Sequence, residues 1–247
     1  MNLEIENNKL KEAYQKAILN MPKETIGVMQ EHTLHRVLKF YFSMDLKNQE
    51  IPIGKMFADV VIDNKIIEIQ TKAFNTLRKK LDVFLKDYDV TIVYPMAFNK
   101  KIHLHSEYGE LISLKKSPKH THVLEIMWEL YKIKNYLLND NLHFKIMMLD
   151  IDEYRTAKPK IRVRDKGYIR ENQIPSYINQ IYEINKPSDF LYILKLYDLP
   201  NQFTSKIFAK KCHLTIKKAT TALNVLNYLN VVKRVGKEKN SYLYEIV

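Results

Sequence analysis

Apolar residues follow two different periods along the first 151 residues, and the two periods predict strands interleaved with helices. Residues 24–43 carry apolar side chains near helical spacing, and residues 76–86 place three leucines on one stripe. A third helix is predicted over residues 123–138. Short segments rich in valine, isoleucine and tyrosine predict strands at 49–62, 65–72, 91–94 and 143–151. This order predicts an α/β domain in which helices cover the faces of a mixed sheet.

Two turn signals refine this domain. Pro95 follows the strand predicted at 91–94 and is expected to end it, because proline cannot donate a backbone hydrogen bond. Gly109 lies between the segments 101–104 and 111–114, which predicts a hairpin there.

The pattern changes after residue 151. Residues 152–187 are basic and irregular around Pro159 and Gly167, so we expect a connector or an arm that faces DNA. The predicted organisation is therefore a domain at 1–151, a basic connector at 152–187 and a C-terminal domain at 188–247.

Residues 188–247 show a helical period followed by a strand period. Helices are predicted to begin at the capping residues Ser188, Thr204 and Thr215, and a hairpin is predicted between residues 231–235 and 242–246. Three helices and a basic hairpin resemble the winged helix-turn-helix layout, in which the last helix enters the major groove of DNA. The alternative is a winged helix used only for protein contacts. The resemblance implies DNA contacts from Lys217, Lys218, Thr221, Lys233, Arg234, Lys237 and Lys239.

The composition narrows the class of protein. The 247 residues are 46% hydrophobic, enough for a substantial core, and carry a formal net charge of +12. Half of the excess positive charge lies in residues 188–247, which favours contacts with phosphates; the alternative is an AT-rich genome that encodes lysine freely. Cys212 is the single cysteine, which excludes internal disulfides and cysteine-based zinc sites. No apolar run reaches transmembrane length and the acidic start lacks a signal-peptide core, so we expect a cytoplasmic protein without membrane contact.

Two carboxylates and an amide are predicted to meet on neighbouring strands. Glu68 and Gln70 share one side of the strand at 65–72 because side chains alternate faces. The short turn at 63–65 brings Asp59 of the preceding strand across to them. Charge without compensation is costly on a sheet rich in valine and isoleucine, so a metal ion is the natural partner. The alternative is a pair of surface carboxylates in an ordinary hairpin.

The order of Asp59, eight intervening residues and a Glu-x-Gln tripeptide resembles the PD-(D/E)xK nuclease superfamily, over about residues 24–151. The chain departs from the family pattern in having no proline before Asp59 and in having Gln70 where lysine is usual. The resemblance implies a restriction-endonuclease-like fold and a Mg²⁺ or Mn²⁺ ion held by Asp59, Glu68 and the carbonyl of Ile69. It also implies that Gln70 orients the attacking water and that Glu31, on the first helix, joins the site.

Several basic and polar residues are ambiguous on sequence alone. Lys72, or one of the residues 78–80 on the next helix, can replace the missing lysine; the alternative for 78–80 is an exposed helix face. His35 shares a helix face with Glu31 but is also an ordinary polar helix residue. The lysines at 100–101, 115–116 and 119 either track phosphates or form solvated loop ends. His103 and His105 alternate on one strand, which allows a zinc site with His120 or His122.

The predicted function is a cytoplasmic, Mg²⁺-dependent DNA endonuclease that is positioned on DNA by its winged helix. A homodimer is possible because two DNA strands must be cut. The first alternative is a catalytically inactive, nuclease-like DNA-binding regulator or architectural protein, and the missing lysine and proline favour it. An RNA-processing nuclease is a further alternative.

Overall fold

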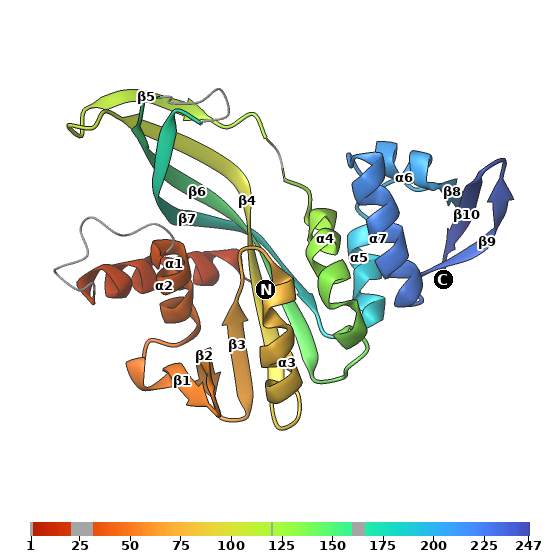
Figure 1. The fold of residues 1–247 in the computed structure, drawn as a ribbon, viewed down its shortest axis with the longest axis horizontal. Helices are drawn as coiled ribbons and strands as arrows, with labels where there is room; N and C mark the ends of the chain where they lie inside the picture. Colours follow the sequence, from red (N-terminus) through yellow and green to blue (C-terminus); the bar gives the residue numbers. More distant parts are fainter. Residues whose placement is uncertain (1, 21–31, 120, 160–165) are drawn as a thin grey trace.

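The computed structural model describes residues 2–20, 32–119, 121–159 and 166–247, and within them the chain forms a mixed sheet covered by helices (Figure 1). The strands follow the order β1-β2-β3-β4-β6-β7, and β5 pairs with the outer part of β4. The first three strands form an antiparallel meander, β3, β4 and β6 run parallel, and β7 returns antiparallel. The predicted mixed α/β sheet is confirmed. The bounds are β1 (Gln49–Ile53), β2 (Met56–Ile62), β3 (Lys65–Ile69), β4 (Asp89–His105), β5 (Leu111–Lys116), β6 (Leu142–Ala157) and β7 (Tyr168–Ile184).

One face of the sheet is covered by α1 (Leu3–Leu19) and α2 (His32–Phe42). Leu38 of α2 packs in one cluster with Ile69 of β3 and Val93 of β4. The α2 helix forms the end of the helix predicted over 24–43, and residues 21–31 lie outside the described residues. The α1 helix was not predicted, because much of its buried surface comes from alanines, which give a weak apolar period.

The other face is covered by α3 (Arg78–Phe84) and by a helical segment built of three short pieces. These are the 3₁₀ turn η3 (Val123–Ile126), α4 (Met127–Leu130) and the 3₁₀ turn η4 (Tyr131–Tyr136). The prediction of one continuous helix over 123–138 was wrong. Ile133 leaves helical geometry, with φ −117° and ψ 25°, and its buried side chain packs in the core.

Pro95 does not end its strand, and the prediction that it would was wrong. β4 continues through Pro95 to His105 and pairs with β6 over most of its length. The carbonyl of Val93 faces β3, where it accepts from the N–H of Gln70, and the alternating backbone turns Pro95 toward that same side. Since β3 pairs no further than Val93, the missing N–H of proline costs no ladder bond there.

The predicted irregular connector at 152–187 was also wrong. β6 extends to Ala157 and pairs with β7, so that Asp152 stands opposite Ile174 and Arg155 opposite Arg170. The charged residues that suggested a loop compensate one another across these strands, and their charge hid the strand period. Residues 152–157 and 168–184 are thus part of the sheet.

The C-terminal segment contains short helices and a small sheet, and the predicted helices and hairpin are present. Thr204 and Thr215 cap α6 and α7 as predicted, by accepting from the N–H groups of Ile207 and Lys218. Ser188 is not the cap: the first turn begins after Lys186, whose N–H donates to the Asp189 carboxylate. The three strands pair in the order β8-β10-β9. The elements are η5 (Pro187–Asp189), α5 (Phe190–Leu194), β8 (Gln202–Thr204), α6 (Ser205–Lys211), α7 (Ile216–Tyr228), β9 (Val232–Glu238) and β10 (Ser241–Ile246).

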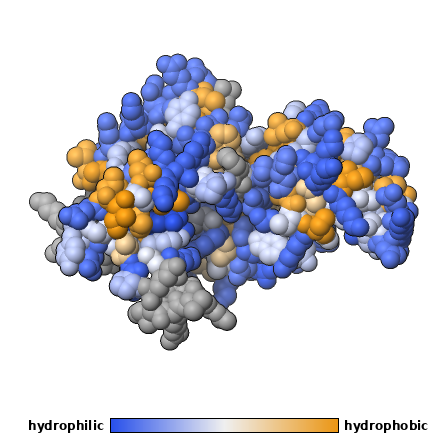
Figure 2. Space-filling view, turned by 90° about the horizontal axis from the view of Figure 1, so that it is seen from above, coloured by the Kyte–Doolittle hydropathy of each residue, from blue (hydrophilic) through white to orange (hydrophobic). Residues whose placement is uncertain are grey.

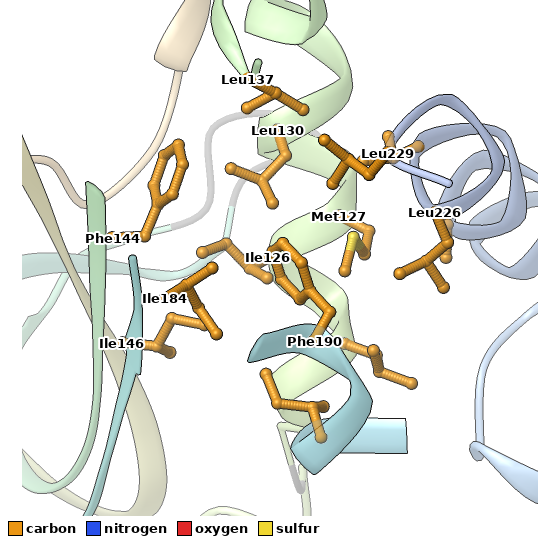
Figure 3. Packing of buried hydrophobic residues seen from close by; sticks show 14 of the residues in the cluster. Ile126, Met127, Leu130, Leu137, Phe144, Ile146, Ile184, Phe190, Leu226 and Leu229 are labelled. Atoms are coloured by element: carbon orange, nitrogen blue, oxygen red, sulfur yellow. The ribbon is translucent and has the colours of Figure 1, made fainter. Parts of the chain in front are cut away.

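The C-terminal helices share one hydrophobic core with the sheet. Figure 3 shows Leu130 of α4 on the side of the sheet residue Phe144, and Met127 of α4 on the side of Leu226 of α7; all four belong to the same buried cluster. This packing joins the end of the chain directly to the helical layer on the sheet.

The surface is mixed in character. Hydrophilic residues cover most of the face in Figure 2, with apolar patches between them on both the sheet part and the C-terminal part. In the described parts of the chain, no helix combines the length and the apolar character needed to cross a membrane.

Candidate active site

The predicted acidic pair does come together. β2 and β3 pair Val60 with Ile67, so one step further along the same register Asp59 stands opposite Glu68. The side chains touch the neighbouring backbone: the N–H of Asp59 donates to Glu68 Oε1 (3.2 Å), and the N–H of Ile69 donates to Asp59 Oδ2 (2.7 Å). Asp59 is 8% exposed and Glu68 2% exposed. Two carboxylates are therefore buried side by side.

Helices on opposite faces of the sheet each bring one further group. On the α1–α2 side, His35 of α2 places Nε2 3.1 Å from Asp59 Oδ2. On the other side, Lys80 of α3 places Nζ 2.7 Å from Glu68 Oε2. The position of Lys80 is set by its neighbour Leu81, which is buried in the core and anchors α3 on the sheet.

The two carboxylates have opposite pKa shifts. Burial and the negative charge of Asp59 raise the pKa of Glu68 to about 7, although Lys80 opposes the shift. Burial also disfavours the charged form of Asp59, but the hydrogen bond and charge of His35 and the N–H of Ile69 outweigh it and lower the pKa. Asp59 is the charged member of the pair, and Glu68 is the member that takes up a proton.

A cavity of about 410 Å³ adjoins the pair and is lined by His35, Ile69, Gln70 and Ala73, among others. The amide of Gln70 donates to the carbonyl of Lys72 (2.6 Å). Ala73 has a left-handed backbone (φ 58°), which is costly for a residue with a Cβ and is typical of functional sites. Asp59 and Glu68 do not line the cavity themselves; it borders on Asp59 through His35 and Ile69, which both bond the Asp59 carboxylate.

The chemistry of the carboxylate pair fits a hard divalent cation. Mg²⁺ is commonly bound by one or two carboxylates, with water and substrate phosphate as its other ligands. Among the described residues no group of three or more His, Cys, Asp or Glu side chains is arranged to hold a metal. Glu31, the predicted third carboxylate, lies outside the described residues, as does His120 of the zinc hypothesis.

Sequence reasoning underestimated His35 and Lys80. His35 was treated as an ordinary helix residue, although its spacing of four from Glu31 placed both on one helix face. Lys80 was one of three adjacent basic residues, and the period of α3 did not distinguish it from Arg78 and Lys79. The signal was the buried Leu81 beside it, which turns the preceding residue toward the edge of the sheet.

At the start of α7, the predicted DNA-binding residues contact the helical layer on the sheet. The ammonium of Lys218 forms an ion pair with Glu125, and that of Lys217 lies 5.2 Å from the centre of the Trp128 ring. The Thr221 hydroxyl donates to the carbonyl of Lys217 (3.0 Å).

The predicted DNA-binding residues of the β9–β10 hairpin are exposed to solvent. Lys233 pairs with Glu245 (2.8 Å), and the guanidinium of Arg234 lies 4.1 Å from the centre of the Tyr242 ring. Lys237 lies over the same ring at 5.3 Å, and Lys239 occupies the turn.

Comparison with known proteins defines the family. Residues 32–185 match DUF8091, a domain of unknown function, and the chain belongs to that family. The match runs from the start of α2 to the end of β7 and so contains the carboxylate pair. An uncharacterized protein of Treponema pallidum (strain Nichols) is 29% identical over 164 residues, which cover 63% of this chain. The chain spans 65% of the length of that relative. No solved structure matches the chain.

Proposed function

We propose that the protein is a divalent-cation-dependent endonuclease that hydrolyses phosphodiester bonds in DNA at Asp59 and Glu68. The observation that carries the proposal is the burial of two facing carboxylates near a cavity, with Lys80 bonded to Glu68 and His35 bonded to Asp59. Two buried acids beside one lysine keep a negative character that a divalent cation would neutralise. When bound there, Mg²⁺ would polarise a water and offset the charge that develops on the phosphoryl oxygens.

Each neighbouring side chain has a role in this proposal. The His35 ring and the N–H of Ile69 fix the orientation of the Asp59 carboxylate, which keeps its second oxygen toward the site. Lys80 serves as the missing motif lysine: its ammonium leaves Glu68 and bonds a phosphoryl oxygen when substrate enters. Gln70 lines the cavity, where its amide can hold the attacking water.

The arrangement of elements supports the two family resemblances. A meander, a helix and a parallel strand, with the acids on β2 and β3, agree with a restriction-endonuclease-like domain. The order α5, β8, α6, α7 and a terminal hairpin agrees with a winged helix. Because the start of α7 contacts η3 and α4, we assign the first DNA contacts to the exposed hairpin lysines and Arg234.

The test is cleavage of supercoiled, linear and branched DNA by the full chain with and without Mn²⁺. Asp59→Asn and Glu68→Gln keep the shapes of the side chains and are expected to abolish cleavage. Asp63→Asn is the matched control, because Asp63 lies in the exposed β2–β3 turn with a left-handed backbone that asparagine also tolerates. Full activity in both site variants, or an equal loss in the control, would contradict the proposal.

A second candidate is a DNA-binding regulator that keeps a nuclease-like domain without catalysis. The observation in its favour is that Lys80 and His35 already bond the carboxylates that would hold the cation. This candidate predicts DNA binding in a gel-shift assay, with no cleavage and no change in thermal stability on addition of Mn²⁺.

A further inference from the structure

A second cavity, of about 500 Å³, has a strongly basic lining. It lies between the segment after β3, the middle of β4 and the start of β7, and the charged residues that line it are Lys72, Lys100, Lys166 and Arg170. Among the described residues that line it, none is a carboxylate. The size is typical of pockets for small ligands.

A buried carboxylate beneath this cavity holds part of the lining in place. Glu153 of β6 is 0% exposed, and its Oε2 accepts from Lys100 Nζ (2.8 Å) and from the Gln173 amide (2.8 Å). Arg170 Nε lies 3.3 Å from the same oxygen. Lys100 and Arg170 are therefore close neighbours that converge on one atom.

A third cation completes the cluster. Arg155 Nε donates to Glu153 Oε1 (2.6 Å), and its guanidinium lies 4.0 Å from the centre of the Tyr168 ring. The cations around it lower the pKa of Glu153 to about 2, against the effect of burial, so the carboxylate is charged at any physiological pH. Three cations share one anion, and their excess positive charge is held in a fixed geometry. Such fixed donors bind an anion without losing much side-chain freedom.

We propose that this basic cavity binds a phosphomonoester, from the end of a nucleic-acid strand or from a mononucleotide. A phosphomonoester carries about −1.5 to −2 charges at neutral pH, against −1 for an internal phosphodiester, and so matches a site with several excess cations. Arg170 is the main donor, because its side chain is 45% exposed while one of its nitrogens is held by Glu153. Lys166 adds a second charge at the rim.

The basic cavity adjoins the cavity beside the carboxylate pair, because Thr71 and Lys72 line both. An anchored strand end would therefore lie close to Asp59 and Glu68. This link to cleavage rests on the proposed function, whereas binding of the phosphate does not.

The test is isothermal titration of the full chain in EDTA. The probes are inorganic phosphate, thymidine monophosphate, and one short single-stranded oligodeoxynucleotide that carries a phosphate at its 5′ end, at its 3′ end or at neither. A terminal phosphate is expected to tighten binding about tenfold, the effect of one good charge-assisted contact. Equal affinity for the oligonucleotides with and without a terminal phosphate would overturn the proposal. Thymidine monophosphate binding as tightly as the phosphorylated strand would support it, with the mononucleotide as the source.

Three variants test whether the terminal phosphate binds in the basic cavity. Arg170→Ala is expected to remove most of the advantage of the terminal phosphate, and Lys166→Ala part of it. Lys55→Ala, in the exposed β1–β2 turn, loses the same charge far from the cavity and should change nothing. Lys166 is not one of the residues that bond Glu153, so its variant keeps the test informative if Arg170→Ala lowers the thermal midpoint. If both cavity variants still bound the phosphorylated oligonucleotide as much more tightly as the wild type does, the ion cluster at Glu153 would have a structural role only.

The result of the binding test does not depend on whether the protein cleaves DNA. Phosphate-dependent binding without DNA cleavage would remove the proposed endonuclease and leave the phosphomonoester site. Cleavage without phosphate-dependent binding would remove the phosphomonoester site and leave the proposed endonuclease.

Discussion

The sheet buries two carboxylate clusters of opposite composition. At Asp59 and Glu68, two acids face each other, and Lys80 is the lysine that the described part of the chain shows bonded to Glu68. At Glu153, one acid bonds to Lys100, Arg155 and Arg170. The pKa shifts differ accordingly: that of Glu68 is raised and that of Glu153 is lowered. The first cluster is short of positive charge and the second has an excess of it.

The comparison shows how burial and partners together decide what a site attracts. The carboxylates of both clusters are buried, so water screens neither charge imbalance well. Glu68 can relieve the imbalance by taking up a proton, but the arginines around Glu153 cannot lose theirs. We therefore expect the acidic pair to favour a cation and the Glu153 cluster to favour an anion.

Glu153→Gln should have the largest effect on stability. The change leaves Lys100, Arg155 and Arg170 clustered without their counter-ion, and breaking a buried ion cluster in this way costs about 3–5 kcal/mol. Urea unfolding of the variant measures the loss. A change below about 1 kcal/mol would mean that the cluster is well solvated.

The pH dependence of stability should have opposite signs at the two clusters. The folded pKa of Glu153 lies near 2, below its ordinary 4.5, so its contribution is complete above pH 4.5 and is lost as the pH falls toward 2. That contribution is about 3 kcal/mol. The folded pKa of Glu68 is raised from 4.5 to about 7, so its contribution is complete below pH 4.5 and declines as the pH rises to 7.

Urea unfolding in EDTA across this range checks both signs. Glu153→Gln should remove the acid-side loss, and Glu68→Gln should remove the decline between pH 4.5 and 7. The same slope in the wild type and both variants would show that other groups set the pH dependence.

Lys80→Ala should have the smallest effect, about 1 kcal/mol, because Glu68 responds to the lost cation by binding a proton. The variant should also be stabilised more by Mn²⁺ than the wild type, since the ammonium no longer competes for Glu68. Thermal unfolding with and without Mn²⁺ measures both effects, and Lys79→Ala on the same helix is the matched control. A larger Mn²⁺ effect in the wild type than in Lys80→Ala would argue that the lysine assists the cation.

The acidic pair was predictable from the sequence because it depends on local rules. Asp59 and Glu68 lie on strands joined by a short turn, and side-chain alternation places them together. The partners His35 and Lys80 come from helices whose approach depends on tertiary packing, so their arrival at the pair could not be derived from spacing alone.

The Glu153 cluster was hidden for a related reason. Lys100 lies on β4, Glu153 and Arg155 on β6, and Arg170 on β7, and their pairing joins segments far apart in the sequence. Viewed along the chain, residues 152–187 appear as a charged connector. Only the pairing of β6 with β7 shows that the charges neutralise one another in part. Pro95 is tolerated inside β4 for another reason that lies outside its local sequence: its backbone faces β3, whose pairing ends at Val93.

The most direct test of the comparison is a crystal structure of the full chain grown with Mn²⁺ and phosphate. We predict an anomalous Mn²⁺ peak between the carboxylates of Asp59 and Glu68, with Lys80 moved away, and a phosphate bonded to Arg170 above Glu153. Lys80 still bonded to Glu68 with no Mn²⁺ beside it, and a basic cavity without phosphate, would contradict the assignment of opposite ligands to the two clusters.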